Sequence, residues 1–173
     1  VFGNPHRMRS PVNVIEELQY LKEKYHYKSV TFWDDTFTFN RKWVMEFCDL
    51  YENTNLDLSI VACSRADIIC NNEDMIKRLS DIGVDCLVIG MESGSQRILD
   101  LIKKGTTVDQ NKEAGRICKK YGIKVFATYM YGLPTETNED VMATYNMIND
   151  INPKYPSPFW YVPIPGTGLY DYC

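Results

Sequence analysis

An apolar run that ends in a glutamate and then in small residues is the part of this sequence best suited to chemistry. The run Val88-Ile89-Gly90-Met91 leads into Glu92-Ser93-Gly94-Ser95. Small residues let the backbone turn sharply into a helix, and the N–H groups and hydroxyls at a helix N-terminus suit an anion or a polar small molecule. Glu92 is placed to accept hydrogen bonds from a ribose or an amine, so the pattern predicts a binding site.

Further polar clusters also follow apolar runs. A cationic loop, Lys103-Lys104-Gly105-Thr106-Thr107, comes shortly after the glutamate, and the other clusters are Asp34-Asp35, Ser64-Arg65 and Tyr131-Gly132. Most of them lie where a predicted strand ends, and parallel α/β sheets and barrels bind their ligands at the carboxyl ends of strands. We therefore expect these clusters to meet at one rim of a sheet.

Alternating strands and helices must carry these clusters. Short β-rich runs predict strands at residues 29–33, 58–63, 86–91 and 123–131, with one further strand at 159–162. Ser10 followed by Pro11 predicts the start of the first helix, and Asn40 and Asn72 predict two more starts. Later helices are predicted at 96–102, 109–121 and 137–151. This order predicts an α/β fold, a parallel sheet with right-handed crossover helices.

The composition excludes some classes of function. Lysine and arginine number 19 against 23 acidic residues, and the formal net charge is −4. Because the charges form no long run of one sign, a nucleic-acid-binding groove is disfavoured. No stretch approaches the ~18 apolar residues of a membrane span, and no signal segment is recognised. We expect a soluble, cytoplasmic protein in which residues 1–173 form one domain.

The cysteines do not predict a metal site. They are scattered singly, as Cys48, Cys63, Cys70, Cys86, Cys118 and Cys173. The sequence has no CxxC, CxxH or HxxxH spacing, which a zinc or haem site would require. Free thiols in a reducing compartment are the expected state.

A series of motifs in fixed order resembles the core of radical S-adenosylmethionine (radical SAM) enzymes. The resemblance is to the group with cobalamin-associated members, methylthiotransferases and oxidative-cyclase-like enzymes. The motifs are Arg7-Met8-Arg9-Ser10-Pro11, Phe32-Trp33-Asp34-Asp35-Thr36-Phe37, Ser64-Arg65-Ala66-Asp67, Gly90-Met91-Glu92-Ser93-Gly94-Ser95, Lys104-Gly105-Thr106-Thr107, Gly132-Leu133-Pro134-Thr135-Glu136-Thr137 and Pro163-Ile164-Pro165-Gly166-Thr167. Each motif alone is weak, but together they span nearly the whole chain, and they imply a (β/α) TIM-like barrel.

One motif of the family does not occur in this sequence. Radical SAM enzymes hold a [4Fe–4S] cluster on a CxxxCxxC loop after the first barrel strand, because three thiolates bind three irons and leave the fourth for the cofactor. The scattered cysteines do not reproduce that spacing. The resemblance therefore implies a partial barrel in which the first strand and cluster loop are missing. We expect that loop upstream of Val1, a [4Fe–4S] cluster in the full-length protein only, and no activity from this polypeptide alone.

The resemblance also implies roles for residues at the strand ends. Asp34 and Asp35 would face the amino group of S-adenosylmethionine, where a carboxylate favours an ammonium. Glu92 would accept from both ribose hydroxyls, with Ser93 as its helper. Lys104 would pair with the cofactor carboxylate, as a point charge where arginine would be bidentate.

Two further sites complete the set that the resemblance implies. Met130, Tyr131 and Gly132 would pass under the adenine, and Arg65 would lie at the edge of the pocket. Simpler structural readings remain open for all of these residues. The Asp pair or Ser93 would cap a turn or helix, and Glu92 would only favour the dipole of the next helix. Arg65 would pair with Asp67 or Glu92, Lys104 would be solvated, and residues 130–132 would be an ordinary strand end.

The implied chemistry is reductive cleavage of S-adenosylmethionine to methionine and a 5′-deoxyadenosyl radical. The radical would abstract hydrogen from a small-molecule substrate that the sequence does not identify. Cobalamin bound by a separate domain, and a dimer formed through an exposed sheet edge, are further expectations. One alternative is a Mg²⁺- or Mn²⁺-dependent barrel lyase or hydrolase that uses Asp34, Asp35 and Glu92. The other is a non-catalytic, partner-binding barrel module with a large apolar patch.

Overall fold

A parallel sheet of five strands forms the centre of the molecule. The structure, a computed structural model, describes residues 7–172, so Cys173 lies outside the described part. The strands lie side by side in chain order, and every neighbouring pair is parallel. They are β1 (Ser29–Phe32), β2 (Ser59–Ser64), β3 (Val84–Glu92), β4 (Lys124–Tyr131) and β5 (Tyr155–Trp160). The predicted α/β fold with a parallel sheet is confirmed.

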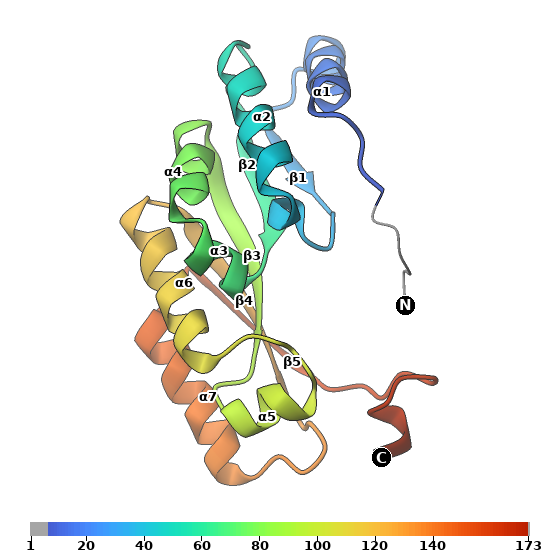
Figure 1. The fold of residues 1–173 in the computed structure, drawn as a ribbon, viewed down its shortest axis with the longest axis vertical. Coiled ribbons are helices and arrows are strands. Elements are labelled where there is room, and N and C mark those ends of the chain that lie inside the picture. Colours follow the sequence, from blue (N-terminus) through green and yellow to red (C-terminus); the bar gives the residue numbers. More distant parts are fainter. Residues whose placement is uncertain (1–6, 173) are drawn as a thin grey trace.

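Helices connect the strands and pack against one face of the sheet. In Figure 1, α4, α6 and α7 lie together on one side of the strands. The helices are α1 (Pro11–Tyr25), α2 (Arg41–Glu52), α3 (Ala66–Asn71), α4 (Glu73–Asp81), α5 (Gln96–Leu101), α6 (Val108–Lys120) and α7 (Asn138–Ile151), with short 3-10 helices η1 (Phe37–Phe39) and η2 (Tyr170–Tyr172). Parallel strands require such crossovers, since a short turn cannot return the chain to the same end of the sheet.

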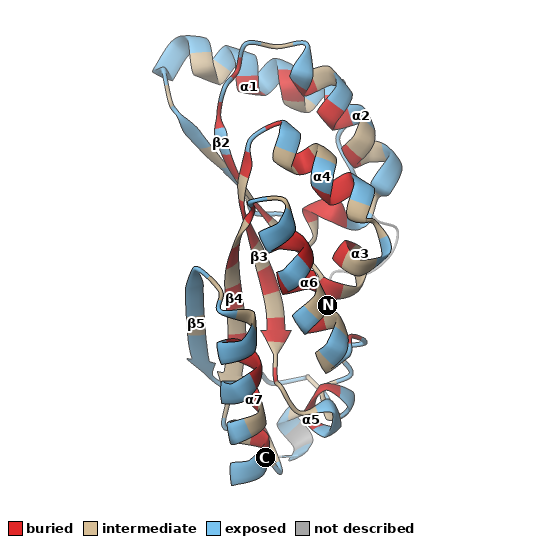
Figure 2. Cartoon of the chain, turned by 90° about the vertical axis from the view of Figure 1, so that its left-hand side faces the viewer, coloured by how far each residue is buried: buried red, intermediate tan, exposed pale blue. Residues whose placement is uncertain are grey.

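Burial along the strands distinguishes the two faces of the sheet. In β3, Leu87 and Ile89 are fully buried against the helices, whereas Val88 and Gly90, which alternate with them, stay half-buried. Figure 2 shows this alternation in the colours of β3 and β4. Successive side chains point to opposite faces, so the half-buried positions share one face. We call it the open face, and its half-buried residues on β2, β3 and β4 include Val61, Cys63, Val88, Gly90, Phe126 and Thr128.

Side-chain caps explain where the helices begin. Ser10 accepts a hydrogen bond from the backbone N–H of Asn13, and Asn40 accepts one from Trp43. The predicted starts at Ser10 and Asn40 are therefore confirmed. Thr107 and Thr137 each complete a capping box with the residue three positions later.

Apart from the short 3-10 helices, which were not predicted, two elements differ from the sequence prediction. The helix α3 was not predicted, because its six residues are too few to show helical periodicity and its N-cap makes no side-chain hydrogen bond. The last strand covers Tyr155–Trp160 and not 159–162. Pro156 and Pro158 disfavour a strand in sequence, but proline is tolerated at the edge of a sheet, and β5 lies at an edge.

The two edges of the sheet differ in their capacity to accept another strand. Tyr161 N donates to Tyr131 O, so the odd-numbered residues of β5 direct their backbone groups toward β4. The backbone groups of the even-numbered residues, which include both prolines, point to the outer edge. Proline has no N–H, so Pro156 and Pro158 remove two donors from that edge. The predicted dimer through a sheet edge stays a prediction, but β5 is poorly suited to it.

A cavity lies beside β1, at the other edge of the sheet. Within the described residues no strand pairs with the outer edge of β1. Lys28 O accepts from Ser59 N on the β2 side, so the alternate residues Ser29 and Thr31 direct their backbone groups to the outer edge. A cavity of about 380 Å³ lies between this strand, α1 and the segment that starts at Arg7. Its apolar lining includes Leu18 and Phe32.

No helix within residues 7–172 is long and apolar enough to cross a membrane.

Phe47 is the aromatic centre of the core beneath α2, and its truncation should be costly. The ring is fully buried, and its centroid lies 5.4 Å from that of Trp43 and 5.6 Å from that of Phe37. We expect Phe47→Ala to lower the free energy of unfolding by about 3–5 kcal/mol, because it leaves a cavity in a packed region. Urea denaturation measures this, with Phe39→Ala as the control, since Phe39 is 60% exposed. Equal losses in the two variants would contradict this account of the core.

Candidate functional site

The carboxyl end of β3 turns in a left-handed conformation at Glu92. This residue has φ +60°, and the pairing of β3 with β4 shifts register between Gly90 and Glu92. A non-glycine residue in this region costs about 1–3 kcal/mol and persists only where neighbouring contacts hold it. Such strain is often found at functional positions, and here the Glu92 side chain lies half-buried beside Gly90 on the open face.

Lys104 reaches the same place through the end of α5. Lys103 has φ +53° and donates its N–H to Asp100 O, while Lys104 N donates to Leu99 O. This is the hydrogen-bond pattern of a Schellman motif, which reverses the chain after a helix. The reversal points Lys104 back toward the strand that precedes the helix.

Glu92 and Lys104 form an ion pair above Gly90. Lys104 Nζ donates to Glu92 Oε1 at 2.7 Å, and the two side chains are 19% and 18% exposed. A methyl group on Gly90 would lie 2.5 Å from the carboxylate oxygen and 2.7 Å from the ammonium nitrogen. The absence of a side chain at Gly90 therefore leaves the space that the ion pair occupies. The structure brings these two predicted site residues into contact.

Arg65 joins the cluster from the end of β2. Its guanidinium pairs with Asp67 through Nε at 3.0 Å and Nη2 at 3.3 Å, and Nη2 also donates to the backbone O of Lys104 at 3.2 Å. The structural alternative for Arg65, a pair with Asp67, is therefore present. The same side chain also holds the loop that carries Lys104.

The turn after Glu92 is supported from the helix side of the sheet. Ser93 is fully buried, and its hydroxyl lies 3.1 Å from that of Thr144, which also accepts from Gly94 N at 2.9 Å. Asn111 on α6 donates to Met91 O at 3.0 Å. That Ser93 binds a cofactor stays a prediction, and in this structure its hydroxyl braces the turn.

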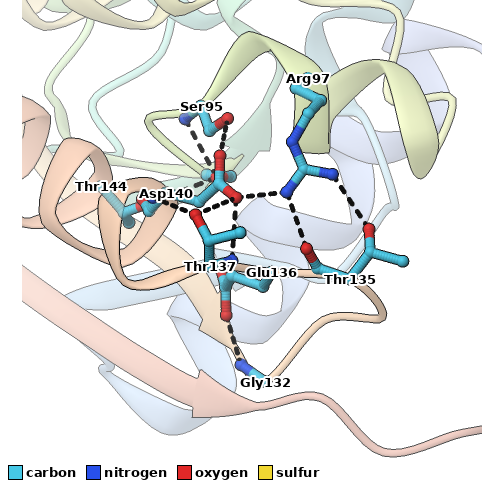
Figure 3. Close-up of polar contacts among 9 residues, drawn as sticks. Ser95, Arg97, Gly132, Thr135, Glu136, Thr137, Asp140 and Thr144 are labelled. Atoms are coloured by element: carbon cyan, nitrogen blue, oxygen red, sulfur yellow. Dashed lines mark hydrogen bonds and ion pairs between the residues drawn. The ribbon is translucent and has the colours of Figure 1, made fainter.

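A buried carboxylate, Asp140, fixes the start of α7 to the start of α5 (Figure 3). Ser95 Oγ donates to Asp140 Oδ1 at 2.5 Å, Thr137 N donates to Oδ2 at 2.9 Å, and Arg97 forms an ion pair with Oδ2. The hydrogen bonds from Ser95, then from Thr137 and Arg97, hold the pKa of Asp140 well below its usual range. Arg97 also bonds Thr135, so the loop after β4 joins this network.

The other predicted site residues lie further along the same rim. Asp34 and Asp35 are exposed after β1, and Asp34 lines the cavity beside that strand. Met130 is half-buried on the side of β4 that bears Thr128. Tyr131 has its ring against Tyr129 and Trp160. The N–H of Gly132 donates to Glu136 Oε2 at 2.6 Å.

No metal site is formed by the described residues. Nowhere in the part of the chain from 7 to 172 do three His, Cys, Asp or Glu side chains gather as metal ligands. The described residues therefore do not support the alternative of a Mg²⁺ or Mn²⁺ site on Asp34, Asp35 and Glu92. The cysteines of the described part, Cys48, Cys63, Cys70, Cys86 and Cys118, form no disulfide. Burial raises the pKa of Cys48 and of Cys118 to about 12, so both are neutral thiols rather than thiolate ligands.

Sequence reasoning missed the residues that support the turn. These are Asn111, Asp140 and Thr144. Only Asp140 left a sequence signal, because Thr137 stands three residues before it in a capping-box spacing. Polar residues in the middle of a helix carry no such signal, since their partners come from other elements.

Comparison with known proteins matches the chain to one family. The family model of the Radical SAM superfamily matches residues 1–148. The chain is 36% identical over 172 residues to uncharacterized methyltransferase PH0819 of Pyrococcus horikoshii, covering 99% of this chain and 37% of that protein. It is 30% identical over 170 residues to anaerobic magnesium-protoporphyrin IX monomethyl ester cyclase of Rubrivivax gelatinosus, covering 98% of this chain and 31% of that protein.

A solved structure supports the same fold. The chain is similar to the radical S-adenosylmethionine methyltransferase TsrM from Kitasatospora setae, with cobalamin and [4Fe–4S] cluster bound. The TM-score is 0.83 at 17% identity, over 94% of this chain and 33% of TsrM. This likeness concerns the fold. The chain spans about a third of the length of the relatives that it matches.

Asp140 should make stability fall at acid pH. Because its folded pKa is depressed, the stability that it contributes is fully present above the unfolded value of about 4 and is lost as pH falls through the folded value. We expect Asp140→Asn to cost about 2 kcal/mol at pH 7, from lost charge-assisted hydrogen bonds. The variant should also lose less stability than the wild type between pH 5 and pH 2.

Urea midpoints measured across this pH range test the prediction. Asp150→Asn is the matched control, because Asp150 is an exposed carboxylate near the end of the same helix. Parallel curves for the wild type and Asp140→Asn would count against the assignment.

Proposed function

The chain belongs to the radical SAM superfamily, and from this premise we propose that the rim around Glu92 and Lys104 binds S-adenosylmethionine. The superfamily consists of enzymes that use S-adenosylmethionine together with a [4Fe–4S] cluster. The full-length protein that contains this chain would use them to start radical chemistry on a small molecule.

We assign the parts of the cofactor to the predicted residues. Glu92 would accept from the ribose hydroxyls, and Lys104 would pair with the carboxylate. Asp34 and Asp35 would hold the amino group, and residues 130–132 would lie under the adenine, with Arg65 at the edge. The single observation that carries the proposal is the ion pair of Glu92 with Lys104 at the carboxyl end of β3.

The chemistry of this rim fits the proposed ligand. S-adenosylmethionine combines a flat, weakly polar base with charged amino-acid groups. Half-buried Val88, Phe126 and Met130 offer apolar contact surface. A carboxylate and an ammonium stand beside them. Ligand sites commonly combine an apolar lining with a few placed polar groups.

The ion pair leaves capacity for a ligand. An ammonium has three donors, and the Glu92 bond uses one of those on Lys104. Within the described residues Glu92 Oε2 takes part in no hydrogen bond, so it is available to a hydroxyl. Lys104 would thus hold the Glu92 carboxylate in place and still contact an anionic group of the ligand.

The described residues do not fit the [4Fe–4S] cluster. Between residues 7 and 172 the cysteines are free and no group of three metal ligands forms. The cluster would therefore be held by a part of the full-length protein other than these residues. This chain's share is to bind and orient S-adenosylmethionine, and that cofactor with the cluster supplies the radical.

Several expectations about the whole protein remain proposals. TsrM is a methyltransferase with cobalamin bound, and the Rubrivivax protein is a cyclase. For the protein that contains this chain we propose a small-molecule substrate, a cytoplasmic location, one barrel domain over residues 1–173, and cobalamin bound by a separate domain.

Removing the Glu92 carboxylate should weaken cofactor binding. We expect Glu92→Gln to raise the dissociation constant of S-adenosylmethionine about 10- to 100-fold, because hydrogen bonds to a charged group are lost. Isothermal titration of the full-length, cluster-reconstituted protein measures it. Glu113→Gln is the control, since Glu113 is a partly exposed carboxylate in an ion pair with Arg116 on α6. An unchanged constant for Glu92→Gln would remove Glu92 from the ribose role.

A methyl group at Gly90 should disturb the site without removing either charge. Gly90→Ala places Cβ against the ends of the Glu92 and Lys104 side chains, which are flexible. We expect about a tenfold loss of affinity for S-adenosylmethionine and a loss of less than about 1 kcal/mol in stability. Titration and thermal unfolding measured on the same sample separate the two effects. Wild-type affinity would show that the position of the ion pair does not matter.

A further inference from the structure

The hydroxyl of Thr144 lies behind the proposed binding rim, on the helix side of the sheet. Thr144 belongs to α7, is fully buried, and is fifty residues from Gly94 in sequence. It lies on the opposite side of the turn from the Glu92–Lys104 pair, which stands above Gly90 on the open face. Its side chain nevertheless contacts the turn that carries Glu92.

The direction of each hydrogen bond at Thr144 follows from counting hydrogens. The hydroxyl donates its one hydrogen to the backbone O of Asp140 at 3.0 Å. It must therefore accept from Gly94 N at 2.9 Å, and from the Ser93 hydroxyl at 3.1 Å. Ser93 Oγ in turn accepts from Ser95 N at 3.1 Å. One hydroxyl thus organises both residues that follow Glu92.

Gly94 makes this contact sterically feasible. A Cβ on Gly94 would lie 2.4 Å from Ala143 O and 2.6 Å from Thr144 Cα. The turn therefore rests directly on the backbone of α7, close enough for a short side chain to reach backbone groups of the turn. A side chain at position 94 would separate the two elements.

The flanks of Glu92 are held on each side. Asn111 binds Met91 O before it, Thr144 binds Ser93 and Gly94 after it, and Asp140 binds Ser95. A residue at φ +60° needs such contacts, since its backbone is otherwise free to relax. Ser93 N donates to Met91 O at 2.8 Å and closes the turn around Glu92, and Thr144 supplies the nearest side-chain contacts on the carboxyl side of that turn.

We propose that Thr144 is a positioning residue for S-adenosylmethionine, which acts through the backbone of residues 93–94 to hold Glu92 at the rim. This inference rests on the proposed function. The residue does not touch the cofactor. Its hydroxyl sets the direction of the carboxylate that does.

Thr144→Val tests the inference in the full-length, cluster-reconstituted protein. Valine keeps the shape of threonine and removes the hydroxyl, so Gly94 N and Ser93 Oγ lose their partner. We expect the dissociation constant of S-adenosylmethionine to rise about tenfold. Hydrogen exchange at the Gly94 amide, measured without the cofactor, should accelerate about tenfold or more. Thr144→Ser, which keeps the hydroxyl, should bind within about threefold of wild type even though it loses a buried methyl group.

Thr54→Val is the matched control. The Thr54 hydroxyl also makes two hydrogen bonds, to Tyr51 O and from Leu56 N, but it lies before β2 at the other end of the sheet. We expect it to reduce stability and to leave the dissociation constant unchanged. The melting temperature of Thr54→Val shows how much the loss of a hydroxyl away from the site lowers stability.

The outcomes separate this inference from the proposed function. The positioning role is overturned if Thr144→Val binds S-adenosylmethionine with wild-type affinity, whether or not exchange at Gly94 changes. It is also overturned if Thr144→Ser loses as much affinity as Thr144→Val. An equal loss of affinity in Thr54→Val overturns it as well. If Glu92→Gln weakens binding while Thr144→Val does not, only the positioning inference fails. If the wild-type protein does not bind S-adenosylmethionine, both fail.

Discussion

The helices α2, α4, α6 and α7 cover the same face of the parallel sheet, and the site depends on this constraint. Parallel strands with crossovers of one hand send their carboxyl ends to one rim and leave one face uncovered. The burial pattern of β3 shows the result, since Leu87 and Ile89 lie in the core while Val88 and Gly90 face outward. Charged groups at the strand ends can then meet without being buried in the core.

The two sides of the turn at Glu92 have different tasks. On the open face the Glu92–Lys104 pair lies over Gly90 and provides opposite charges for a ligand. On the helix side, buried hydroxyls and a carboxylate hold the backbone, and the depressed pKa of Asp140 reflects how fully that carboxylate is hydrogen-bonded. Because the chain belongs to the radical SAM superfamily, S-adenosylmethionine is the ligand proposed for the open face. The contacts on the helix side would hold Glu92 in position for it.

Much of the fold was predictable because its signals are local. Ser10 and Asn40 cap helices as predicted, and the central strands lie within a residue or two of the predicted bounds. The misses have physical causes. The helix α3 is too short to show periodicity, and Pro156 and Pro158 conceal a strand that exists because its other edge pairs with β4.

The sequence by itself determined which residue types stand at the strand ends, and hence the family resemblance and the set that includes Arg65, Glu92 and Lys104. Only the tertiary structure decided which of them meet. Lys104 turns back to Glu92, whereas Arg65 pairs with Asp67 and braces the Lys104 loop. Thr144 could not be predicted as a partner of Gly94, because a hydrogen bond across fifty residues depends on how α7 packs, which no local pattern encodes.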